Sequence, residues 1–114
     1  MKSTGQLGEL MAVNYLRTQQ FLILQQNFRT RFGELDIIAK KDNSIHIVEV
    51  KFQTSPIINS AYKLNKNKRR RMIQSTQVFM DQFKLNHYFY QFDLIEIVKE
   101  TIQHKKNIFN LNDV

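Results

Sequence analysis

The segment GELDIIAKKDNSIHIVEVK, residues 33–51, alternates apolar and charged residues on both sides of a polar centre. Two apolar runs flank Asp42–Asn43, and both of these residues are strong turn formers. The segment therefore predicts a β-hairpin with strands over Gly33–Lys40 and Ile45–Gln53. Strand interiors seldom keep charged side chains. Four charged residues nevertheless lie inside these two strands: Glu34, Asp36, Glu49 and Lys51.

A turn centred on Asp42–Asn43 fixes which residues of the hairpin face each other. The predicted opposed pairs on one face are Lys41–Ser44, Ile38–Ile47, Asp36–Glu49 and Glu34–Lys51. Because side chains alternate along a strand, the other face carries a second set. That set is Leu35, Ile37 and Ala39 opposite Val50, Val48 and His46. The second set is nearly all apolar, so we expect it to be the core face.

The opposition of Asp36 to Glu49 is physically unusual. Directly opposed residues have Cβ atoms roughly 4.5–5.5 Å apart, and like charges at that separation destabilise a sheet. A proton or a cation between the two carboxylates would relieve the repulsion. Oxygen ligands without cysteine favour a hard ion, Mg²⁺ or Mn²⁺. On the same face Lys51 would hold a water near the metal or stabilise negative charge on a phosphate.

Two alternatives to a metal site follow from the same residues. The charges could form a solvated cross-strand lattice in which Glu49 pairs with Lys51 and Glu34. A register shift of one residue would also separate Asp36 from Glu49.

Glu9 is a further candidate, on a predicted first helix whose neighbouring positions are small and apolar. Its carboxylate either interacts with the dipole at the helix start or points toward a buried group. Gly8 costs a helix roughly 1 kcal/mol relative to Ala. A close approach of the helix backbone to the sheet would explain that cost.

The segment Lys63–Arg71 concentrates basic residues at the start of a predicted second helix. Such a cluster indicates either a solvated helix face or a stripe that contacts phosphates. Cations at a helix start oppose the helix dipole, which favours a partner. The whole chain has 17 Lys and Arg against 10 Asp and Glu, a net charge of +7, which also points to an anionic partner.

The remaining sequence predicts one domain over residues 1–114. Apolar periodicity predicts two helices, Ser3–Arg17 and Asn65–Phe83, and three further strands, Phe21–Phe28, Tyr90–Val98 and Ile102–Phe109. A hairpin-rich sheet flanked by helices belongs to the α/β or α+β class. The histidines show no ligand spacing, so we interpret them as structural or exposed. With no cysteine, signal segment or long apolar run, we expect a cytoplasmic protein without a membrane span.

A set of motifs extends over nearly the whole chain. The set is Gly5-x-x-Gly8-Glu9-x-x-Ala12, Asn27-x-Arg29, Gly33–Ala39, Asp36 followed by Glu49-Val50-Lys51, Lys68 with Arg71, and Phe92-Asp93. Together these motifs resemble the YraN family of small bacterial proteins, which is assigned to the PD-(D/E)XK restriction-endonuclease-like superfamily. The chain departs from the family at Phe52–Gln53, where a small polar residue and an arginine are usual.

This resemblance implies a central mixed β-sheet with flanking helices and a metal-dependent endonuclease that cuts DNA. Asp36 and Glu49 would ligate Mg²⁺ or Mn²⁺ with the Val50 carbonyl, and Glu9 would bind through water or a second metal. Lys51 would orient the attacking water and stabilise the phosphate. The residues expected to contact nucleic acid are Arg29, Lys66, Lys68, Arg69 and Arg71. A homodimer is expected if both DNA strands are cut.

Two other functions are compatible with the same sequence. The domain could be a nucleic-acid-binding module that retains the nuclease fold without catalysis, and metal binding by the acidic residues would distinguish the two. It could also be an interaction protein whose basic helix meets an acidic protein, which predicts no salt-sensitive binding to DNA.

Overall fold

The computed structural model describes residues 4–53 and 64–111, and the order of its elements is that predicted from the sequence. The helices are α1 (Thr4–Thr18) and α2 (Lys66–Phe83), and the strands are β1 (Leu22–Thr30), β2 (Gly33–Lys41), β3 (Ser44–Gln53), β4 (Phe89–Val98) and β5 (Thr101–Phe109). The helix start predicted at Ser3 and the loop predicted around Pro56 lie outside the described residues.

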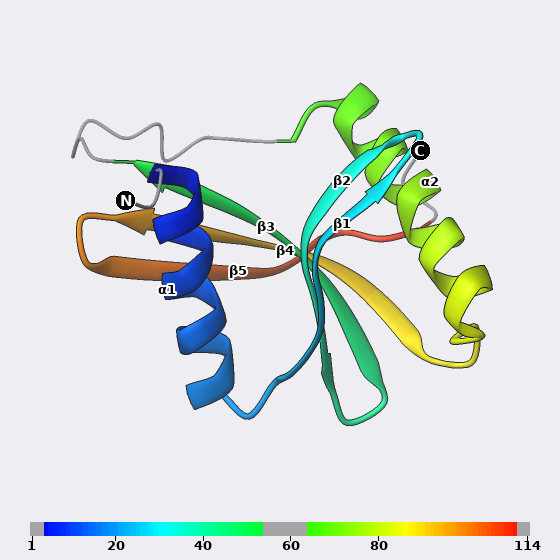
Figure 1. Cartoon of the computed structure of the whole chain (residues 1–114), viewed down its shortest axis with the longest axis horizontal. Helices are drawn as coiled ribbons and strands as arrows, with labels where there is room; N and C mark the ends of the chain where they lie inside the picture. The colour runs from blue at the N-terminus through cyan, green and yellow to red at the C-terminus, as the bar shows by residue number, and fades with distance from the viewer. Residues whose placement is uncertain (1–3, 54–63, 112–114) are drawn as a thin grey trace.

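The five strands form one mixed sheet in the order β1-β2-β3-β4-β5 (Figure 1). Only β3 and β4 run parallel, and the other neighbouring pairs are antiparallel. Between β3 and β4 the chain passes through α2, as a parallel connection requires. The predicted α+β class and mixed sheet are therefore confirmed.

The predicted register of the hairpin is confirmed from its turn as far as Ile37, which pairs with Val48. Lys41 pairs with Ser44 and Ile38 with Ile47, as a turn at Asp42–Asn43 requires. Asp42 adopts a φ of 53°, the left-handed conformation that aspartate tolerates in tight turns. The β2–β3 ladder ends at Ile37 and Val48, one residue before Asp36 and Glu49.

The prediction of a single core face on this hairpin is wrong, because helices cover both faces (Figure 1). One cluster packs the α2 residues Met72 and Phe79 on Ile38 and Ile47, and both isoleucines are fully buried. The other cluster packs α1 on Ile37, Ala39 and Val48: its helix residues are Ala12, Val13 and Leu16. A strand buried on both faces needs apolar residues at successive positions, and Ile45–Val50 has them except at His46 and Glu49.

Leu35 also lies on a different face from the one predicted. It packs with Ile38 in the α2 cluster, whereas Ile37 packs against α1. Opposite this part of β2, Asn27 of β1 has a left-handed φ of 53°, and the neighbouring pairs Gln26–Ile37 and Phe28–Leu35 flank it. This local irregularity breaks the alternation of side chains, so Phe28 and Leu35 both turn to the α2 side.

Both helices are fixed at the ends that approach the acidic residues. A Cβ added to Gly8 of α1 would lie 2.7 Å from the Cβ of Phe52 on β3, so the predicted close approach of helix and sheet is present. Asn65 caps α2 by accepting a hydrogen bond from the Lys68 N–H at 2.8 Å. Neither of the two helices in the described chain is long and apolar enough to cross a membrane.

The two outer strands, β1 and β5, are irregular. The pairing of β1 with β2 shifts register between Ile23 and Gln25. The pairing of β5 with β4 shifts register where it passes Asp93, and Asn107 of β5 has a φ of 56°. Neither edge of the sheet is therefore a continuous, regular strand.

Candidate functional site

The candidate site lies where the β2–β3 ladder ends. Beyond Ile37 and Val48 the Asp36 side chain acts as the hydrogen-bond acceptor that a backbone carbonyl provides elsewhere in the ladder. Its Oδ2 accepts a hydrogen bond of 2.9 Å from the Val50 N–H. This contact satisfies a strand amide that the ladder leaves without a partner. It also fixes the Asp36 carboxylate between the two strands, at the start of the segment that contains Glu49, Val50 and Lys51.

Four carboxylates meet at this position. Ligand oxygens of Glu9, Glu34 and Asp36 lie within 4.8 Å of one another. Glu49 is 8% exposed and lies close enough to Asp36 for a side-chain hydrogen bond between the two. We refer to Glu9, Glu34, Asp36 and Glu49 as the acidic cluster. The sequence predicted three of these four residues as site residues and missed Glu34 in that role.

The acidic cluster changes the titration of Asp36. Burial, followed by the charge of Glu49 and more weakly that of Glu9, raises the pKa of Asp36 from its ordinary value of 3.8 to about 7. The hydrogen bond from the Val50 N–H acts in the opposite direction but does not cancel the increase. Asp36 therefore keeps its proton in part near neutral pH, as expected for a largely buried carboxyl group beside another carboxylate.

Two residues of β1 hold the outer members of the acidic cluster. Asn27 Nδ2 donates to Glu9 Oε1 at 2.8 Å and, more weakly, to Glu34 Oε1 at 3.5 Å. Arg29 Nε donates to Glu34 Oε2 at 2.8 Å. Asn27 thus connects α1 to β2. The motif Asn27-x-Arg29 included Asn27, but the sequence analysis assigned it no role, because a left-handed strand residue cannot be recognised from side-chain alternation.

The opposition of Glu34 to Lys51 that the hairpin register predicted does not occur, since the ladder has ended and Glu34 binds Arg29 instead. Lys51 has an exposed side chain on β3, and its neighbour on β4 is Glu96, which is 3% exposed. Because β3 pairs regularly with β4 over its whole length, Lys51 shares a face with Glu49. That placement agrees with the predicted side of the sheet.

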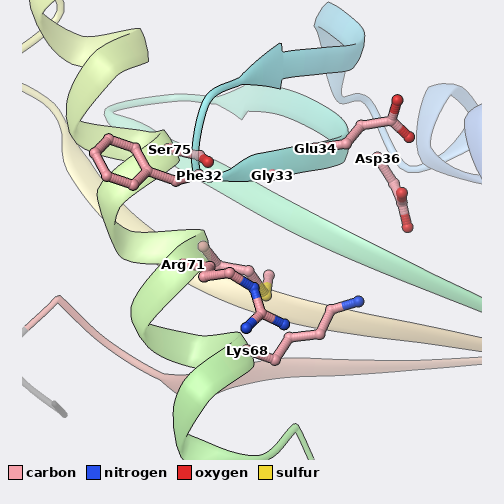
Figure 2. A pocket seen from close by; sticks show the side chains of 8 residues that line it. Phe32, Gly33, Glu34, Asp36, Lys68, Arg71 and Ser75 are labelled. Carbon is pink, nitrogen blue, oxygen red and sulfur yellow. The ribbon is translucent and has the colours of Figure 1, made fainter.

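Helix α2 supplies the basic side of the site. Lys68 Nζ forms an ion pair of 2.7 Å with Glu49 Oε2. A pocket of about 290 Å³ lies between α2 and β2, and its lining includes Glu34, Asp36, Lys68 and Arg71. Figure 2 shows the acidic side chains of β2 and the basic side chains of α2 on opposite sides of this pocket. Acidic side chains from β2 and basic side chains from α2 therefore line the same pocket.

The other predicted nucleic-acid contacts are divided between surface and structural positions. Lys66 is exposed at the first turn of α2. Arg69 instead donates from Nη1 to the Leu64 carbonyl oxygen at 2.6 Å, which ties the helix to the residue before its cap. Arg29 is occupied by Glu34 but keeps 83% of its side chain exposed. Lys68 and Arg71 are the predicted contacts that face the pocket.

The acidic cluster fits a divalent cation of the magnesium type. Its possible ligands are all oxygens, from three carboxylates within reach of one another and from Glu49 beside them. Burial, and then the charge of Glu49, raise the pKa of Asp36, so a negative charge at this position is unfavourable without a cation beside it. A doubly charged ion would displace the proton of Asp36 and remove the repulsion between the carboxylates. Zinc, which favours nitrogen and sulfur ligands, fits this cluster less well.

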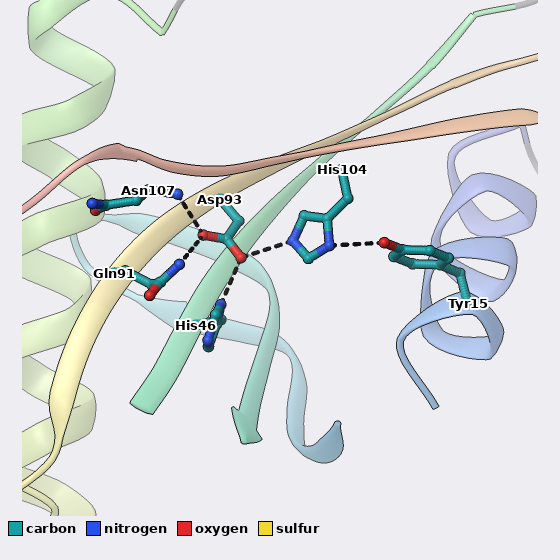
Figure 3. A network of polar contacts seen from close by, with 6 residues as sticks. All are labelled: Tyr15, His46, Gln91, Asp93, His104 and Asn107. Carbon is teal, nitrogen blue, oxygen red and sulfur yellow. Dashed lines mark hydrogen bonds and ion pairs between the residues drawn. The ribbon is translucent and has the colours of Figure 1, made fainter. Parts of the chain in front are cut away.

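A second polar cluster lies on the α1 side of the sheet, centred on the fully buried Asp93 (Figure 3). Asp93 Oδ2 accepts hydrogen bonds from His46 Nδ1 at 2.6 Å and from His104 Nε2 at 2.8 Å. Its Oδ1 accepts from Gln91 Nε2 and from the Asn107 N–H. Burial alone would raise the pKa of Asp93, but these hydrogen bonds outweigh it and hold the pKa below its ordinary value.

This second cluster forms a hydrogen-bonded network, although two histidines and an aspartate also lie within ligand distance of one another. The short nitrogen–oxygen separations are those of hydrogen bonds, and a shared metal at about 2.0–2.2 Å from each ligand would push the atoms further apart. His104 Nδ1 also pairs with the Tyr15 hydroxyl at 3.0 Å. The network joins α1, β3, β4 and β5, which agrees with the structural role predicted for His46 and His104.

The chain matches the model of the uncharacterised protein family UPF0102 over residues 8–97. It is 42% identical over 106 residues to a UPF0102 protein of Campylobacter fetus, with 91% of each chain covered. It is 38% identical to a UPF0102 protein of Persephonella marina, with 95% of this chain and 94% of the relative covered. A Clostridium botulinum UPF0102 protein is 32% identical, with 94% and 89% covered. These matches confirm the YraN-like family that the motifs predicted.

Proposed function

Because the chain belongs to the UPF0102 family, whose description assigns no activity, we propose a function from the geometry of its own residues. We propose that this domain is a metal-dependent nuclease of the PD-(D/E)XK type that hydrolyses DNA phosphodiester bonds. The observation that carries the proposal is the contact between the acidic cluster, in which the pKa of Asp36 is raised, and a basic helix across one pocket. A phosphodiester needs both parts, since it is an anion that must be held and then attacked.

In this proposal Asp36 and Glu49 would hold Mg²⁺ or Mn²⁺ together with the Val50 carbonyl, and Glu9 would contribute through water. When bound, the ion would polarise the phosphate and lower the pKa of a bound water. Asp36 is held in place for this role by the Val50 N–H. Asn27 fixes the carboxylate of Glu9 from the neighbouring strand.

Lys51 is the proposed electrostatic catalyst. Phosphodiester hydrolysis builds negative charge on the phosphoryl oxygens, and carboxylates cannot donate hydrogen bonds to them. Lys51 lies on the same face of β3 as Glu49 and has an exposed side chain. Its ammonium group can donate to the developing charge and orient the attacking water. Lys66, Lys68 and Arg71 would hold the flanking phosphates along the first turns of α2.

The test is cleavage of a panel of linear, single-stranded and branched DNAs with Mg²⁺ and with Mn²⁺. We expect the wild type to cut at least one substrate and Asp36→Asn to cut none. Asp42→Asn is the matched control, because it makes the same change at the hairpin turn, where asparagine tolerates the left-handed backbone. Salt-sensitive DNA binding without cleavage would favour the non-catalytic binding module. Absence of both would favour an acidic protein as the partner of α2.

A further inference from the structure

The ion pair between Lys68 and Glu49 joins the two walls of the site. Lys68 Nζ lies 2.7 Å from Glu49 Oε2, and the side chains are 37% and 11% exposed. The backbone of Lys68 is fixed independently, because its N–H is held by the Asn65 cap. The side chain, in contrast, is a flexible four-carbon stem with a compact charge at its end. The ammonium can therefore change partners without any movement of the helix.

Each member of the acidic cluster other than Asp36 has a different partner. Glu34 is bound by Arg29, Glu9 by Asn27 and Glu49 by Lys68. Arg29 and Asn27 belong to β1, whereas Lys68 comes from α2 and lines the pocket. Lys68 is therefore a cation that neutralises Glu49, one of the two carboxylates proposed to ligate the metal.

Simultaneous binding of a divalent ion and the Lys68 ammonium to the Glu49 carboxylate is electrostatically unfavourable. A metal ligated by Glu49 at about 2.1 Å would lie close to an ammonium on the same carboxylate, and the two cations would repel each other. The pocket lined by Lys68 and Arg71 offers the displaced ammonium a position that faces an incoming phosphate. The negative charge of the phosphate would replace that of Glu49 as the partner of the Lys68 ammonium.

We propose that Lys68 is a displaceable counter-ion, which neutralises Glu49 in the metal-free protein and transfers to a DNA phosphate when a divalent cation binds Glu49. This inference rests on the proposed function. In this role Lys68 affects metal binding as well as DNA binding, whereas a residue that only contacts phosphate would affect DNA binding alone. One consequence is that Lys68 lowers the affinity for metal in the absence of DNA. A second is that bound metal raises the affinity for DNA, and bound DNA the affinity for metal, partly through Lys68.

The first experiment measures Mn²⁺ binding by calorimetry in the absence of DNA. In Lys68→Gln the competing charge is gone, and we expect binding about tenfold tighter than in the wild type, the effect of one charge-assisted hydrogen bond. Lys68→Arg keeps the competing charge and should bind as weakly as the wild type.

Arg71→Gln is the matched control for this experiment. Arg71 lines the same pocket and carries the same charge, but in the described part of the chain it forms no ion pair. It should change metal affinity by less than about threefold, the share expected from a nearby charge screened by solvent. The difference between the two glutamine variants isolates the direct contact with Glu49 from the general effect of removing a cation.

The second experiment measures the salt dependence of DNA binding in a Lys51→Ala background, in which cleavage is expected to be about 10²–10³ slower than in the wild type. With Mn²⁺, adding Lys68→Gln should lower the slope of log K against log salt by roughly 0.9, the value for one phosphate contact on duplex DNA. With EDTA the slope should not change, because Lys68 then remains on Glu49.

The outcomes separate the two proposals. If the wild type binds no Mn²⁺ at millimolar concentration, the proposed metal site itself is refuted. If the wild type binds Mn²⁺ but Lys68→Gln binds it equally or less tightly, the counter-ion role is refuted and the proposed function stands. An identical loss of salt slope with Mn²⁺ and with EDTA would also refute the counter-ion role, since Lys68 would then contact phosphate without the metal.

Discussion

Replacing Asp36 with asparagine should make the metal-free protein more stable at alkaline pH. The change is nearly isosteric, and the amide oxygen can still accept the hydrogen bond from the Val50 N–H. What it removes is a partly buried negative charge beside Glu49 and Glu9. A site residue that costs stability in this way is expected where function and folding conflict.

The magnitude follows from the pKa of Asp36. A rise from 3.8 to about 7 corresponds to about 4 kcal/mol at about 1.36 kcal/mol per unit. Asp36 is only partly buried and solvent screens its interactions, so we expect a gain of about 2–3 kcal/mol in Asp36→Asn at pH 8.

The sign of the pH dependence is fixed by the raised pKa. Between 3.8 and about 7 the folded protein binds more protons than the unfolded chain. The stabilising contribution of protonated Asp36 is therefore fully present below pH 3.8 and is lost as the pH rises through about 7. The advantage of Asp36→Asn should accordingly be large at pH 8, about half as large at pH 5 and small near pH 4.

The assay is urea denaturation of wild type, Asp36→Asn and the control Asp42→Asn in EDTA at pH 4, 5 and 8. An Asp36→Asn protein that is no more stable than the wild type at pH 8 would refute the reasoning. So would a difference that does not vary with pH. Millimolar Mn²⁺ should then raise the melting temperature of the wild type more than that of Asp36→Asn, because binding to the folded state stabilises it.

Three further predictions concern other parts of the molecule. Lys51→Ala should lower the cleavage rate by about 10²–10³ in a single-turnover assay while leaving calorimetric metal binding intact; unchanged cleavage would exclude the proposed role. Gly8→Ala should destabilise the fold by about 1–3 kcal/mol in urea denaturation, because the new methyl group would overlap the Phe52 side chain; equal stability would show that α1 can shift at no cost. Asp93→Asn should cost about 3 kcal/mol, since an amide cannot accept all the hydrogen bonds that the carboxylate accepts. The exposed Asp81→Asn is its control and should leave the melting temperature unchanged.

The parts of the site that could be predicted from sequence are those set by short-range rules. The turn at Asp42–Asn43 fixes the register through Ile37 and Val48, and that register brings Asp36 next to Glu49. The helix predicted over Asn65–Phe83 from its apolar periodicity is also confirmed, and Asn65 is the cap of Lys66–Phe83.

The parts that could not be predicted depend on contacts between separate elements or on backbone exceptions. The ion pair of Lys68 with Glu49 forms only when α2 packs on the sheet, and no spacing rule relates the two residues. The left-handed Asn27 reverses the faces of Phe28 and Leu35, which side-chain alternation predicts incorrectly. A partial signal was present in β3, where consecutive apolar residues indicate burial on both faces.

The irregular outer strands limit how this sheet can associate with other chains. An exposed edge pairs with a further strand only where several successive backbone groups are presented in register. On β1 the register shift at Ile23–Gln25 and the left-handed Asn27 interrupt that series. On β5 the left-handed Asn107 interrupts the series, and the exposed Lys106 precedes it directly. In the described residues 4–53 and 64–111 these interruptions disfavour growth of the sheet at both edges, so we expect a second copy or a partner protein to dock through side chains on a face.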